Sequence, residues 1–380
     1  MRVGIEYTSA VTQREGIGRS TREIVRAILK LPQRPDLHLF YAHRGPVQAA
    51  DDLARHDGVT VCRLPISPRV MLASWYKLRI PFPIELLLGR LHVVHGPDFV
   101  LPPRIAAAGI VTIHDLAFVT RPQDADPAQR RFLERAVPAA IAHARIVVAV
   151  SETTRRELME QYGVPPHRIR VIPNAVSPIF EIQDTPDNLA AARHRLRLPQ
   201  EYLLSVGSIH PRKNLGGVAR AAAQASQRLK RALPVVHVGR EGWLCAQVFS
   251  EVTAAGSPGI RFVGQASDEM LRALYRQAVA LVYPSFQEGF GIPILEAFAC
   301  GTPVVTSNSS GMREAAGDAA EFVDPHDADS IASGIMRVME DPCRRDKLVR
   351  HGTDRLRHYS WAHSAERMLK VYAEAAMGDR

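Results

Sequence analysis

Short apolar runs rich in Val, Ile and Leu recur along the whole chain, and helix-like stretches separate them. Apolar runs of about four to eight residues that alternate with helices are typical of buried parallel strands covered by helices on both faces. In the first half, the predicted strands lie near residues 2–7, 37–42, 59–63, 92–95, 110–114, 146–150 and 169–172. In the second half, they lie near residues 202–207, 234–239, 260–263, 280–283, 303–306 and 321–323. The pattern predicts an α/β protein with doubly wound parallel sheets.

The length of 380 residues predicts two such domains, because a single core stops growing beyond about 250–300 residues. A polar stretch punctuated by prolines, from Ser177 to Pro199, separates the two sets of strands and is predicted to be the linker. We therefore assign residues 1–177 to the first domain and residues 178–358 to the second.

Composition places the chain among cytoplasmic globular proteins. Hydrophobic residues make up 46% of the sequence, but no apolar run approaches the roughly 20 residues that a membrane span needs. Met1–Ile5 reads directly as a strand, without the pattern of a signal peptide. The four cysteines are widely spaced and form no C-x-x-C motif, which argues against structural zinc and against a disulfide framework.

The net charge of +9 is concentrated in the first half of the chain. Residues 1–177 contain 24 Lys and Arg against 16 Asp and Glu, whereas the remaining residues contain 24 against 23. Such an excess is compatible with nucleic acid, an acidic substrate or an anionic membrane surface. The basic residues are dispersed and no nucleic-acid-binding motif accompanies them, so nucleic acid is the least favoured partner.

Two carboxylates, Glu288 and Glu296, flank a glycine-bearing turn at the expected start of a helix. If the helix begins near Ile292, Glu296 lies one turn inside it and Glu288 stays on the preceding loop. The unpaired amides between them suit the oxygens of a sugar or a diphosphate. The alternative is a pair of solvated charges at a helix end. The strand–loop–helix–strand context favours a ligand site, because open parallel sheets bind ligands at the carboxyl ends of their strands.

A second loop joins an apolar strand to two adjacent cations. After Leu203–Val206, the chain runs Gly207-Ser208-Ile209-His210-Pro211-Arg212-Lys213-Asn214 and then enters a helix. An Arg-Lys pair alone is usually a solvated patch, but at this position it can form charge-assisted bonds to phosphate.

Together these segments resemble two motifs of the retaining, nucleotide-sugar-dependent family 4 glycosyltransferases. Glu288 to Glu296 is similar to the E-x7-E motif, and Gly207 to Asn214 is similar to the G-x4-R-K-N loop. The resemblance implies the GT-B fold, in which two Rossmann-like domains face each other across a cleft. It also implies that a last helix, within about residues 359–380, crosses back to the first domain. The first domain would take the acceptor and the second the nucleotide-sugar donor.

The resemblance also assigns roles to individual residues. Arg212 and Lys213 would stabilise the leaving diphosphate, Glu288 would hold hydroxyls of the donor sugar, and Glu296 would bind the ribose. His114, at a strand end, would position the transferring sugar, although a lone His there is more often structural. The further residues expected at the donor are Gly16, Gly18, Gly239, Arg240, Val263, Gly264, Ser285, Gly289, Phe290, Gly291 and Ile292. The acceptor-side candidates are Arg19, His95, Asp115, Ser151 and Arg155.

The mechanism implied by the resemblance retains the anomeric configuration and uses no cofactor. Asp124-Ala125-Asp126 and Asp327-Ala328-Asp329 do not follow strands as a metal-binding donor site requires, and the second triplet resembles a helix start. We therefore expect no metal ion, with Arg212 and Lys213 supplying the positive charge instead.

The substrates and two rival functions stay open. The segments around His95, His114 and Ile172–Ala175 look most like the mannosyltransferase branch, for which GDP-mannose is the usual donor and a UDP-sugar the alternative. A glycan, a lipid-linked sugar or a small molecule could be the acceptor. A UDP-sugar epimerase, or a noncatalytic subunit of a polysaccharide-synthesis complex, would share the fold.

Peripheral membrane contact is a further open alternative. The segment Ser67–Pro83, followed by Leu86–Leu88, mixes aromatic, aliphatic and basic residues and could dock on an anionic inner membrane face. An ordinary helix that covers the sheet is the favoured interpretation, because prolines interrupt any long amphipathic face.

Overall fold

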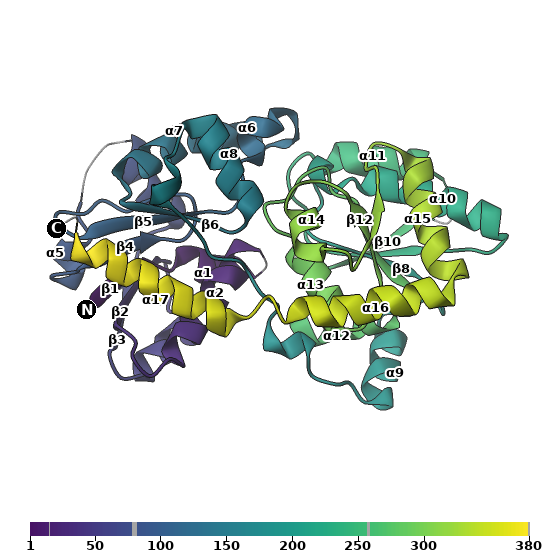
Figure 1. Ribbon diagram of the computed structural model, residues 1–380, viewed down its shortest axis with the longest axis horizontal. Coiled ribbons are helices and arrows are strands. Elements are labelled where there is room, and N and C mark those ends of the chain that lie inside the picture. The colour runs from purple at the N-terminus through teal and green to yellow at the C-terminus, as the bar shows by residue number, and fades with distance from the viewer. Residues whose placement is uncertain (15, 78–81, 257–258, 379–380) are drawn as a thin grey trace. The chain divides into compact units, whose positions relative to one another are not determined.

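The computed structural model describes residues 1–14, 16–77, 82–256 and 259–378 and divides into two compact units (Figure 1). Unit 1 comprises residues 1–119, 127–174 and 361–380, and unit 2 comprises residues 120–126 and 175–360. The predicted division, after residues 177 and 358, differs chiefly in residues 120–126. The prediction places this segment in the first domain, but it packs with unit 2.

Unit 1 is built on a seven-stranded sheet in the order β3-β2-β1-β4-β5-β6-β7, and neighbouring strands are parallel throughout the described residues. The strands are β1 (Arg2–Glu6), β2 (Asp36–Ala42), β3 (Val59–Leu64), β4 (Val93–Gly96), β5 (Ala108–Ile113), β6 (Ile146–Ala149) and β7 (Ile169–Val171). The central strands β4 and β6 are buried at every position, as expected for strands covered on both faces.

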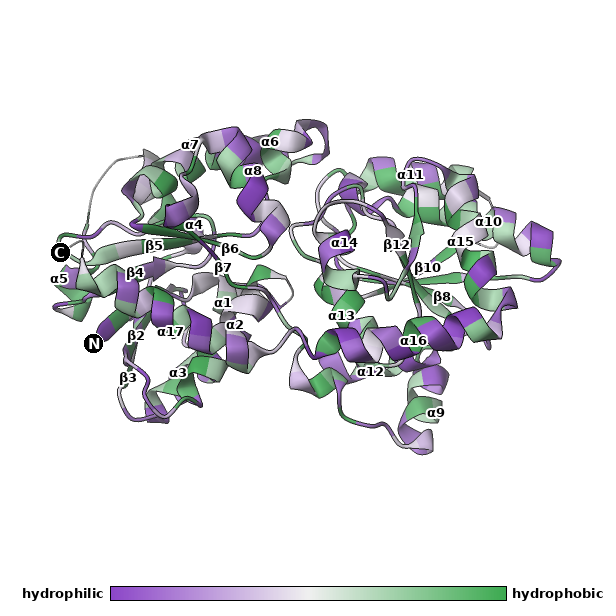
Figure 2. Ribbon diagram, in the orientation of Figure 1, coloured by the Kyte–Doolittle hydropathy of each residue, from purple (hydrophilic) through white to green (hydrophobic). Residues whose placement is uncertain are grey.

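The helices of unit 1 follow the strands in the predicted alternation. They are α1 (Thr8–Thr12), α2 (Ile17–Leu29), α3 (Gln48–Asp51), α4 (Pro68–Leu72), α5 (Glu85–Leu88), α7 (Pro127–His143), α8 (Glu152–Tyr162) and α17 (Trp361–Met377). Helix α6 (Ala117–Thr120) ends at the first residue of the segment that packs with unit 2. In both units, the strands are coloured mainly as hydrophobic and the outer faces of the helices as hydrophilic (Figure 2).

Unit 2 contains a six-stranded parallel sheet in the order β10-β9-β8-β11-β12-β13. The strands are β8 (Leu203–Val206), β9 (Val235–Val238), β10 (Ile260–Gly264), β11 (Ala280–Tyr283), β12 (Val304–Ser307) and β13 (Glu321–Val323). Each strand predicted from the apolar runs is thus present in one of the two sheets. The prediction of two doubly wound α/β domains is confirmed.

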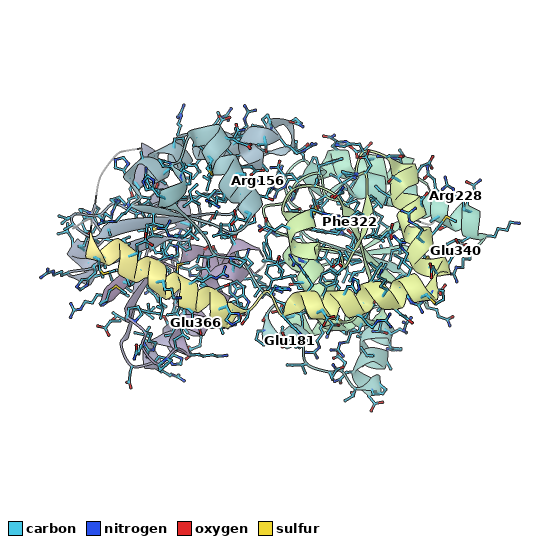
Figure 3. All side chains as sticks on the ribbon, viewed as in Figure 1. Arg156, Glu181, Arg228, Phe322, Glu340 and Glu366 are labelled. Atoms are coloured by element: carbon cyan, nitrogen blue, oxygen red, sulfur yellow. The ribbon has the colours of Figure 1, made fainter. Side chains whose placement is uncertain are left out.

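Helices precede, separate and follow the strands of unit 2. They are α9 (Pro186–Arg195), α10 (Leu215–Leu229), α11 (Cys245–Ala254), α12 (Asp268–Gln277), α13 (Ile292–Ala299), α14 (Ser310–Ala316), α15 (Ala328–Glu340) and α16 (Pro342–Leu356). Arg228, near the end of α10 (Figure 3), pairs with Asp329 at the start of α15, with 2.7 Å between Nη2 and Oδ1. Asp327 caps α15, so the second Asp-x-Asp triplet is a helix start, as predicted.

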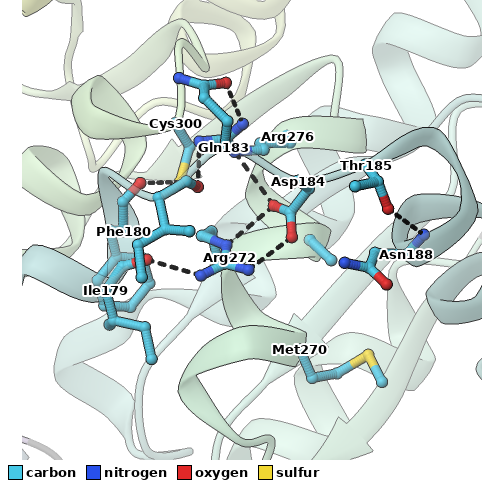
Figure 4. Close-up of polar contacts among 12 residues, drawn as sticks. Ile179, Phe180, Gln183, Asp184, Thr185, Asn188, Met270, Arg272, Arg276 and Cys300 are labelled. Atoms are coloured by element: carbon cyan, nitrogen blue, oxygen red, sulfur yellow. Dashed lines mark hydrogen bonds and ion pairs between the residues drawn. The ribbon is translucent and has the colours of Figure 1, made fainter.

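The predicted linker, Ser177–Pro199, is a packed part of unit 2 and not a free connection. Asp184 accepts two hydrogen bonds from Arg272 of α12, at 2.9 Å from Nε and 2.6 Å from Nη2, and Arg276 lies 3.3 Å from the same carboxylate (Figure 4). Arg272 also donates to Ile179 O at 2.8 Å. The side chains of Asp184 and Arg272 are 2% and 8% exposed, and a carboxylate this deeply buried requires such compensation. The composition indicates a polar segment, but it does not indicate that Asp184 pairs with Arg272.

Helix α17 belongs to unit 1, although unit 2 precedes it in the chain. It packs against α2 and against β4 and β5. Tyr372 is buried against the sheet, and the Ser364 hydroxyl donates to Pro173 O at 2.7 Å. The predicted return of the last helix to the first domain is confirmed.

The segment from Ser67 to Pro83 begins with α4, capped by Ser67, and continues as a π-helical turn over Ala73–Lys77. Met71 is buried, and Trp75 packs against the core cluster that contains Phe40 and Leu91. The part of this segment at residues 78–81 lies outside the described residues. Within the described residues, no helix has the length and apolarity that crossing a membrane requires.

Candidate active site

The loops that follow the strands of unit 2 converge at the carboxyl edge of the sheet. The backbone of Gly239, after β9, lies so close to the loop after β8 that a Cβ at this position would be 1.8 Å from Gly207 O. Only glycine permits this approach. Beside them, Gly264 has a φ of +77° where the pairing of β9 with β10 shifts register, and its carbonyl accepts from Gly239 N at 2.9 Å. Val263 precedes Gly264 in β10, and the exposed Arg240 follows Gly239 in the loop after β9.

A charged cluster lies at this edge. Lys213 Nζ is 2.6 Å from Glu288 Oε1 and 2.6 Å from the Tyr283 hydroxyl, and Arg212 Nη2 is 4.0 Å from Glu288 Oε2. The side chains of Arg212, Lys213 and Glu288 are between 11% and 14% exposed. Two loops that are separate in sequence thus bring together the residues that the two motifs singled out.

The cluster holds Glu288 in its ionised form. Burial opposes ionisation, but the charges of Lys213 and Arg212 and the hydrogen bond from Lys213 outweigh it and lower the pKa of Glu288 to about 2. Burial and the neighbouring Glu288 raise the pKa of Tyr283 well above its usual value, so its hydroxyl stays protonated. The site therefore presents one carboxylate and two cations at neutral pH.

The asparagine that follows the Arg-Lys pair, Asn214, holds the loop in place. Its φ of +57° is left-handed, a conformation that Asn tolerates better than most residues, and its side chain caps α10 by accepting from Gly217 N at 3.2 Å. Its Nδ2 donates to Pro284 O at 3.2 Å and to Pro325 O at 2.7 Å. Asn214 thereby fixes the loop of Arg212 and Lys213 against the loop that carries Glu288.

The turn between the two glutamates has the predicted form. Helix α13 begins at Ile292, and Gly291, with a φ of +117°, occupies its N-cap. Glu288 lies on the loop, where Ser310 Oγ accepts from its amide at 3.1 Å, and Glu296 lies one turn inside the helix. Glu296 is 3% exposed, and its Oε2 accepts from the Tyr275 hydroxyl at 2.9 Å.

The remaining donor-side candidates of this turn are buried. Ser285 is fully buried and Phe290 is 4% exposed, with its ring edge-on to Tyr359 at 5.3 Å. A Cβ at Gly311, in α14, would lie 2.5 Å from Gly289 O, which shows how closely α14 packs on the turn. The donor roles of these residues stay predictions.

The glycine-bearing loop of unit 1 lies between α1 and α2. Gly16, with a φ of +56°, is the N-cap of α2. A Cβ at Gly18 would lie 2.1 Å from Gln13 O, so only glycine fits there. Arg19 is 7% exposed. The expected contacts of these three residues with substrates stay predictions.

His114 follows β5 at the carboxyl edge of the first sheet. Its Nε2 is 2.7 Å from Pro97 O and therefore donates, which leaves Nδ1 as the acceptor of the neutral ring. Burial lowers the pKa of His114, and the charge of Asp98 opposes this shift. The side chain of Asp115 caps the next turn, since its Oδ1 accepts from Ala117 N at 3.0 Å.

His95 is tied into the core of unit 1. Its Nδ1 is 2.9 Å from the Tyr372 hydroxyl and its Nε2 is 2.8 Å from Thr112 Oγ1, and the residue is 2% exposed. Both ring nitrogens are occupied, as in a structural histidine, and burial lowers its pKa to about 3. Its role at the acceptor stays a prediction.

Helix α8 carries the other acceptor-side candidates. Ser151 is fully buried and caps the helix, because its Oγ accepts from Thr154 N at 3.0 Å. Arg155 pairs with Glu152 at 3.0 Å, and Arg156 (Figure 3) is 3.4 Å from Thr153 Oγ1. These contacts are local to the helix.

Several residues at the two sheet edges escaped the motif analysis. Tyr283 and Tyr275 contact Lys213 and Glu296, and His210 lies beside Arg212 with its ring stacked on Trp243 at 4.3 Å. In unit 1, burial raises the pKa of Glu6, at the end of β1, to about 7, and Asp98 adds to this effect. Tyr283 and Glu6 lie at strand ends, which the sequence can indicate, whereas Tyr275 lies within α12 and has no such signal.

Comparison with known proteins agrees with this geometry. Residues 188–355 match the family model described as Glycosyl transferases group 1, and residues 14–179 match the model described as Glycosyltransferase Family 4. The O-antigen chain mannosyltransferase B of Escherichia coli is 30% identical over 94% of this chain and 95% of its own length.

Two solved structures show the same fold. Sucrose-phosphate synthase from Thermosynechococcus elongatus superposes with a TM-score of 0.77 at 20% identity and full coverage of both chains. HepE from Anabaena, in complex with UDP and glucose, superposes with a TM-score of 0.74 at 16% identity, covering 98% of this chain and all of that one. From the two family matches and the full-length relative, we conclude that the chain belongs to glycosyltransferase family 4 and is a glycosyltransferase of the GT-B fold.

Proposed function

We propose that the enzyme transfers mannose from GDP-mannose to a glycan, a lipid-linked sugar or a small-molecule acceptor, with retention of the anomeric configuration. The observation that carries this proposal is the buried cluster of Arg212, Lys213 and Glu288 at the carboxyl edge of the second sheet. The mannose donor is supported by the full-length relative, which is named a mannosyltransferase. The HepE complex with UDP and glucose makes a UDP-sugar the alternative donor.

In the proposed reaction, the bond between the anomeric carbon and the diphosphate oxygen breaks, and the diphosphate leaves as part of GDP. Arg212 and Lys213 stabilise the charge that develops on it, so the reaction needs no bound metal or cofactor. The acceptor hydroxyl attacks from the face that the diphosphate leaves, and its proton passes to a diphosphate oxygen. No enzymic nucleophile is required in this scheme.

The carboxylates bind and orient the donor. Glu288 is ionised at neutral pH and accepts hydrogen bonds from hydroxyls of the donor sugar, while Glu296, held by Tyr275, accepts from the ribose. His114 positions the transferring sugar, with Nε2 anchored on Pro97 O. Because the ring is already fixed, little conformational entropy is lost when the substrate binds.

The test is transfer and nucleotide binding with purified protein. Calorimetry with GDP, UDP and ADP, without metal and then with magnesium, identifies the base. Assays with the matching sugar conjugates then identify the donor, and the anomeric configuration of the product is read by NMR. Binding of UDP alone would replace the donor but keep the site. Interconversion of a UDP-sugar without an acceptor would establish the epimerase instead, and no nucleotide binding would favour the noncatalytic subunit.

We also propose that unit 1 contacts the anionic inner face of the membrane from the cytoplasm, at the amino edge of its sheet. Leu86 and Leu87 of α5 are 62% and 43% exposed, and Ile105, which precedes β5, is 67% exposed. Glu85 Oε1 accepts from the amides of residues 105–107 and so holds α5 beside Ile105. A group of large exposed aliphatic residues usually marks an interaction site.

The charge near this apolar group favours a bilayer with anionic lipids. Arg90 follows α5 and is exposed, Arg104 precedes Ile105, and Arg2 begins β1, at the same edge of the sheet. Each cation near an anionic surface contributes about 1 kcal/mol to binding.

Sedimentation with vesicles of phosphatidylglycerol and phosphatidylcholine tests this contact. The wild type should bind the mixed vesicles and not pure phosphatidylcholine, and Leu86→Ser with Leu87→Ser should reduce binding at least about fivefold. Ile182→Ser, at a residue of unit 2 that is 55% exposed, is the matched control. Equal binding by all three proteins would exclude this surface.

A further inference from the structure

His210 lies at the candidate diphosphate site, but no motif includes its side chain. It precedes the short 3-10 helix Pro211–Lys213, after β8, and is 2% exposed. Its Nδ1 is buried and has no hydrogen-bond partner among the residues that the structure describes. Buried polar atoms nearly always have a partner, so a missing one calls for an explanation.

The His210 ring is held in one orientation by Trp243. The two rings are stacked, with 4.3 Å between their centroids and 9° between their planes. The loops that carry them are joined by hydrogen bonds from Ile209 N to Arg240 O at 2.9 Å and from Gly242 N to Ile209 O at 3.0 Å. Trp243 Nε1 donates to Asp124 O at 2.6 Å, which fixes the indole in turn. A nitrogen fixed in this way is prepared for a ligand before the ligand arrives.

The surroundings of His210 favour a neutral imidazole. Burial lowers its pKa well below the usual value, and the charges of Arg212 and Lys213, on the same loop, lower it further. Glu288, from the loop after β11, opposes this shift, and His237 of β9 adds to it slightly. A neutral ring can bind an anionic oxygen through its N–H, beside the two cations.

We propose that His210 binds the diphosphate of the donor, with a ring nitrogen hydrogen-bonded to a phosphate oxygen beside Arg212 and Lys213. This inference rests on the proposed function, since it requires a nucleoside diphosphate in unit 2. Trp243 is a positioning residue that holds the imidazole through the stacked rings.

Calorimetric titration of the full chain with GDP and GMP, and in parallel with UDP and UMP, separates the diphosphate from the rest of the nucleotide. A charge-assisted hydrogen bond predicts that His210→Ala weakens diphosphate binding about tenfold. The affinity for the monophosphate should change less than about twofold. His358→Ala, at an exposed histidine of unit 2, is the matched control and should bind as the wild type does.

Two conservative variants identify the nitrogen and guard against a folding defect. The amide of Asn lies where Nδ1 lies, and that of Gln reaches toward Nε2, so the one that retains diphosphate affinity reports which nitrogen binds. Trp243→Phe should preserve the selective affinity better than Trp243→Ala does. The melting temperature without ligand, compared for each variant and the wild type, separates a lost contact from lost structure.

Each result decides the inference. If the wild type binds GDP or UDP but His210→Ala binds it equally well, His210 does not contact the diphosphate. If diphosphate and monophosphate affinities fall together, the assignment to the diphosphate is wrong. If the wild type binds no nucleotide, the proposed function fails, and this inference fails with it.

Discussion

Lys213 Nζ and Glu288 Oε1 are 2.6 Å apart, so the principal cation and the principal carboxylate of the candidate donor site are paired with each other. A nucleotide sugar offers a partner to each, with its phosphates for Lys213 and its hydroxyls for Glu288. Donor binding would then replace one compensated pair by two contacts, and neither charge would be buried alone. We expect a substitution at either residue to affect both binding and turnover.

Lys213→Ala and Glu288→Ala should each lower turnover at least about tenfold, as expected for groups that act on developing charge or on sugar position. Initial rates at saturating donor measure this effect. Arg228→Ala, which removes an exposed ion pair between α10 and α15, is the control and should leave the rate unchanged. Near-normal rates in both site variants would remove this cluster from the mechanism.

Glu6 predicts a loss of stability at high pH. Its pKa is about 7 in the folded protein against the ordinary value of 4.5, so the protonated form stabilises the fold below about pH 4.5. That contribution is lost as pH rises through 7 and amounts to at most about 3 kcal/mol. Relative to the wild type, Glu6→Gln should therefore be more stable at pH 8 than at pH 5.

Urea unfolding of both proteins at the two pH values measures this difference. Identical changes in the free energy of unfolding at pH 5 and pH 8 would show that Glu6 does not titrate between them.

The buried pair of Asp184 and Arg272 predicts a stability effect far from the candidate site. Within the part of the chain that the structure describes, Arg272→Ala leaves Asp184 with Arg276 as its one charged partner, and it should cost about 3 kcal/mol. Arg231→Ala, which breaks an exposed pair with Glu201, should cost less than about 1 kcal/mol. Urea unfolding measures both values, and similar costs would contradict the role of burial.

Gly239 predicts a steric effect on nucleotide binding. A Cβ at this position would lie 1.8 Å from Gly207 O, so Gly239→Ala must separate the loops after β8 and β9. We expect at least about a tenfold loss of nucleotide affinity. Gly45→Ala is the matched control, because a Cβ there meets no atom within 4 Å. Unchanged affinity in Gly239→Ala would show that these loops need no close contact.

The sequence predicted the strands and the start of α13 well, because apolar runs and glycine stops are local signals. It also placed Lys213 and Glu288 on loops that follow strands, and parallel strands bring their carboxyl ends to one edge. The sequence did not predict contacts between distant residues. Asp184 and Arg272 are separated by 88 positions, and no local pattern indicates that a polar stretch will bury an ion pair.

Contacts between distant residues also explain the other features of the structure that the sequence did not predict. Tyr283 was recognised only as the end of a strand, because its hydroxyl meets Lys213 through the pairing of strands and not through spacing. Residues 120–126 were assigned with their sequence neighbours, whereas Trp243 and Phe286 of unit 2 contact them. Arg121 lies over the Phe286 ring at 4.6 Å. Contacts between residues that are distant in the sequence leave no periodic pattern by which they could be predicted.

Because α17 packs into unit 1 after the chain has passed through unit 2, unit 1 is assembled from segments made before and after unit 2. A ribosome that has completed residues 1–174 has not yet made the helix that covers α2 and holds His95 through Tyr372. During translation, the strands β1 to β7 of unit 1 are therefore made before β8, the first strand of unit 2, but α17 is made only after unit 2. A chain cut after Ser360 would therefore contain the whole sheet of unit 1 but lose a helix that packs on it.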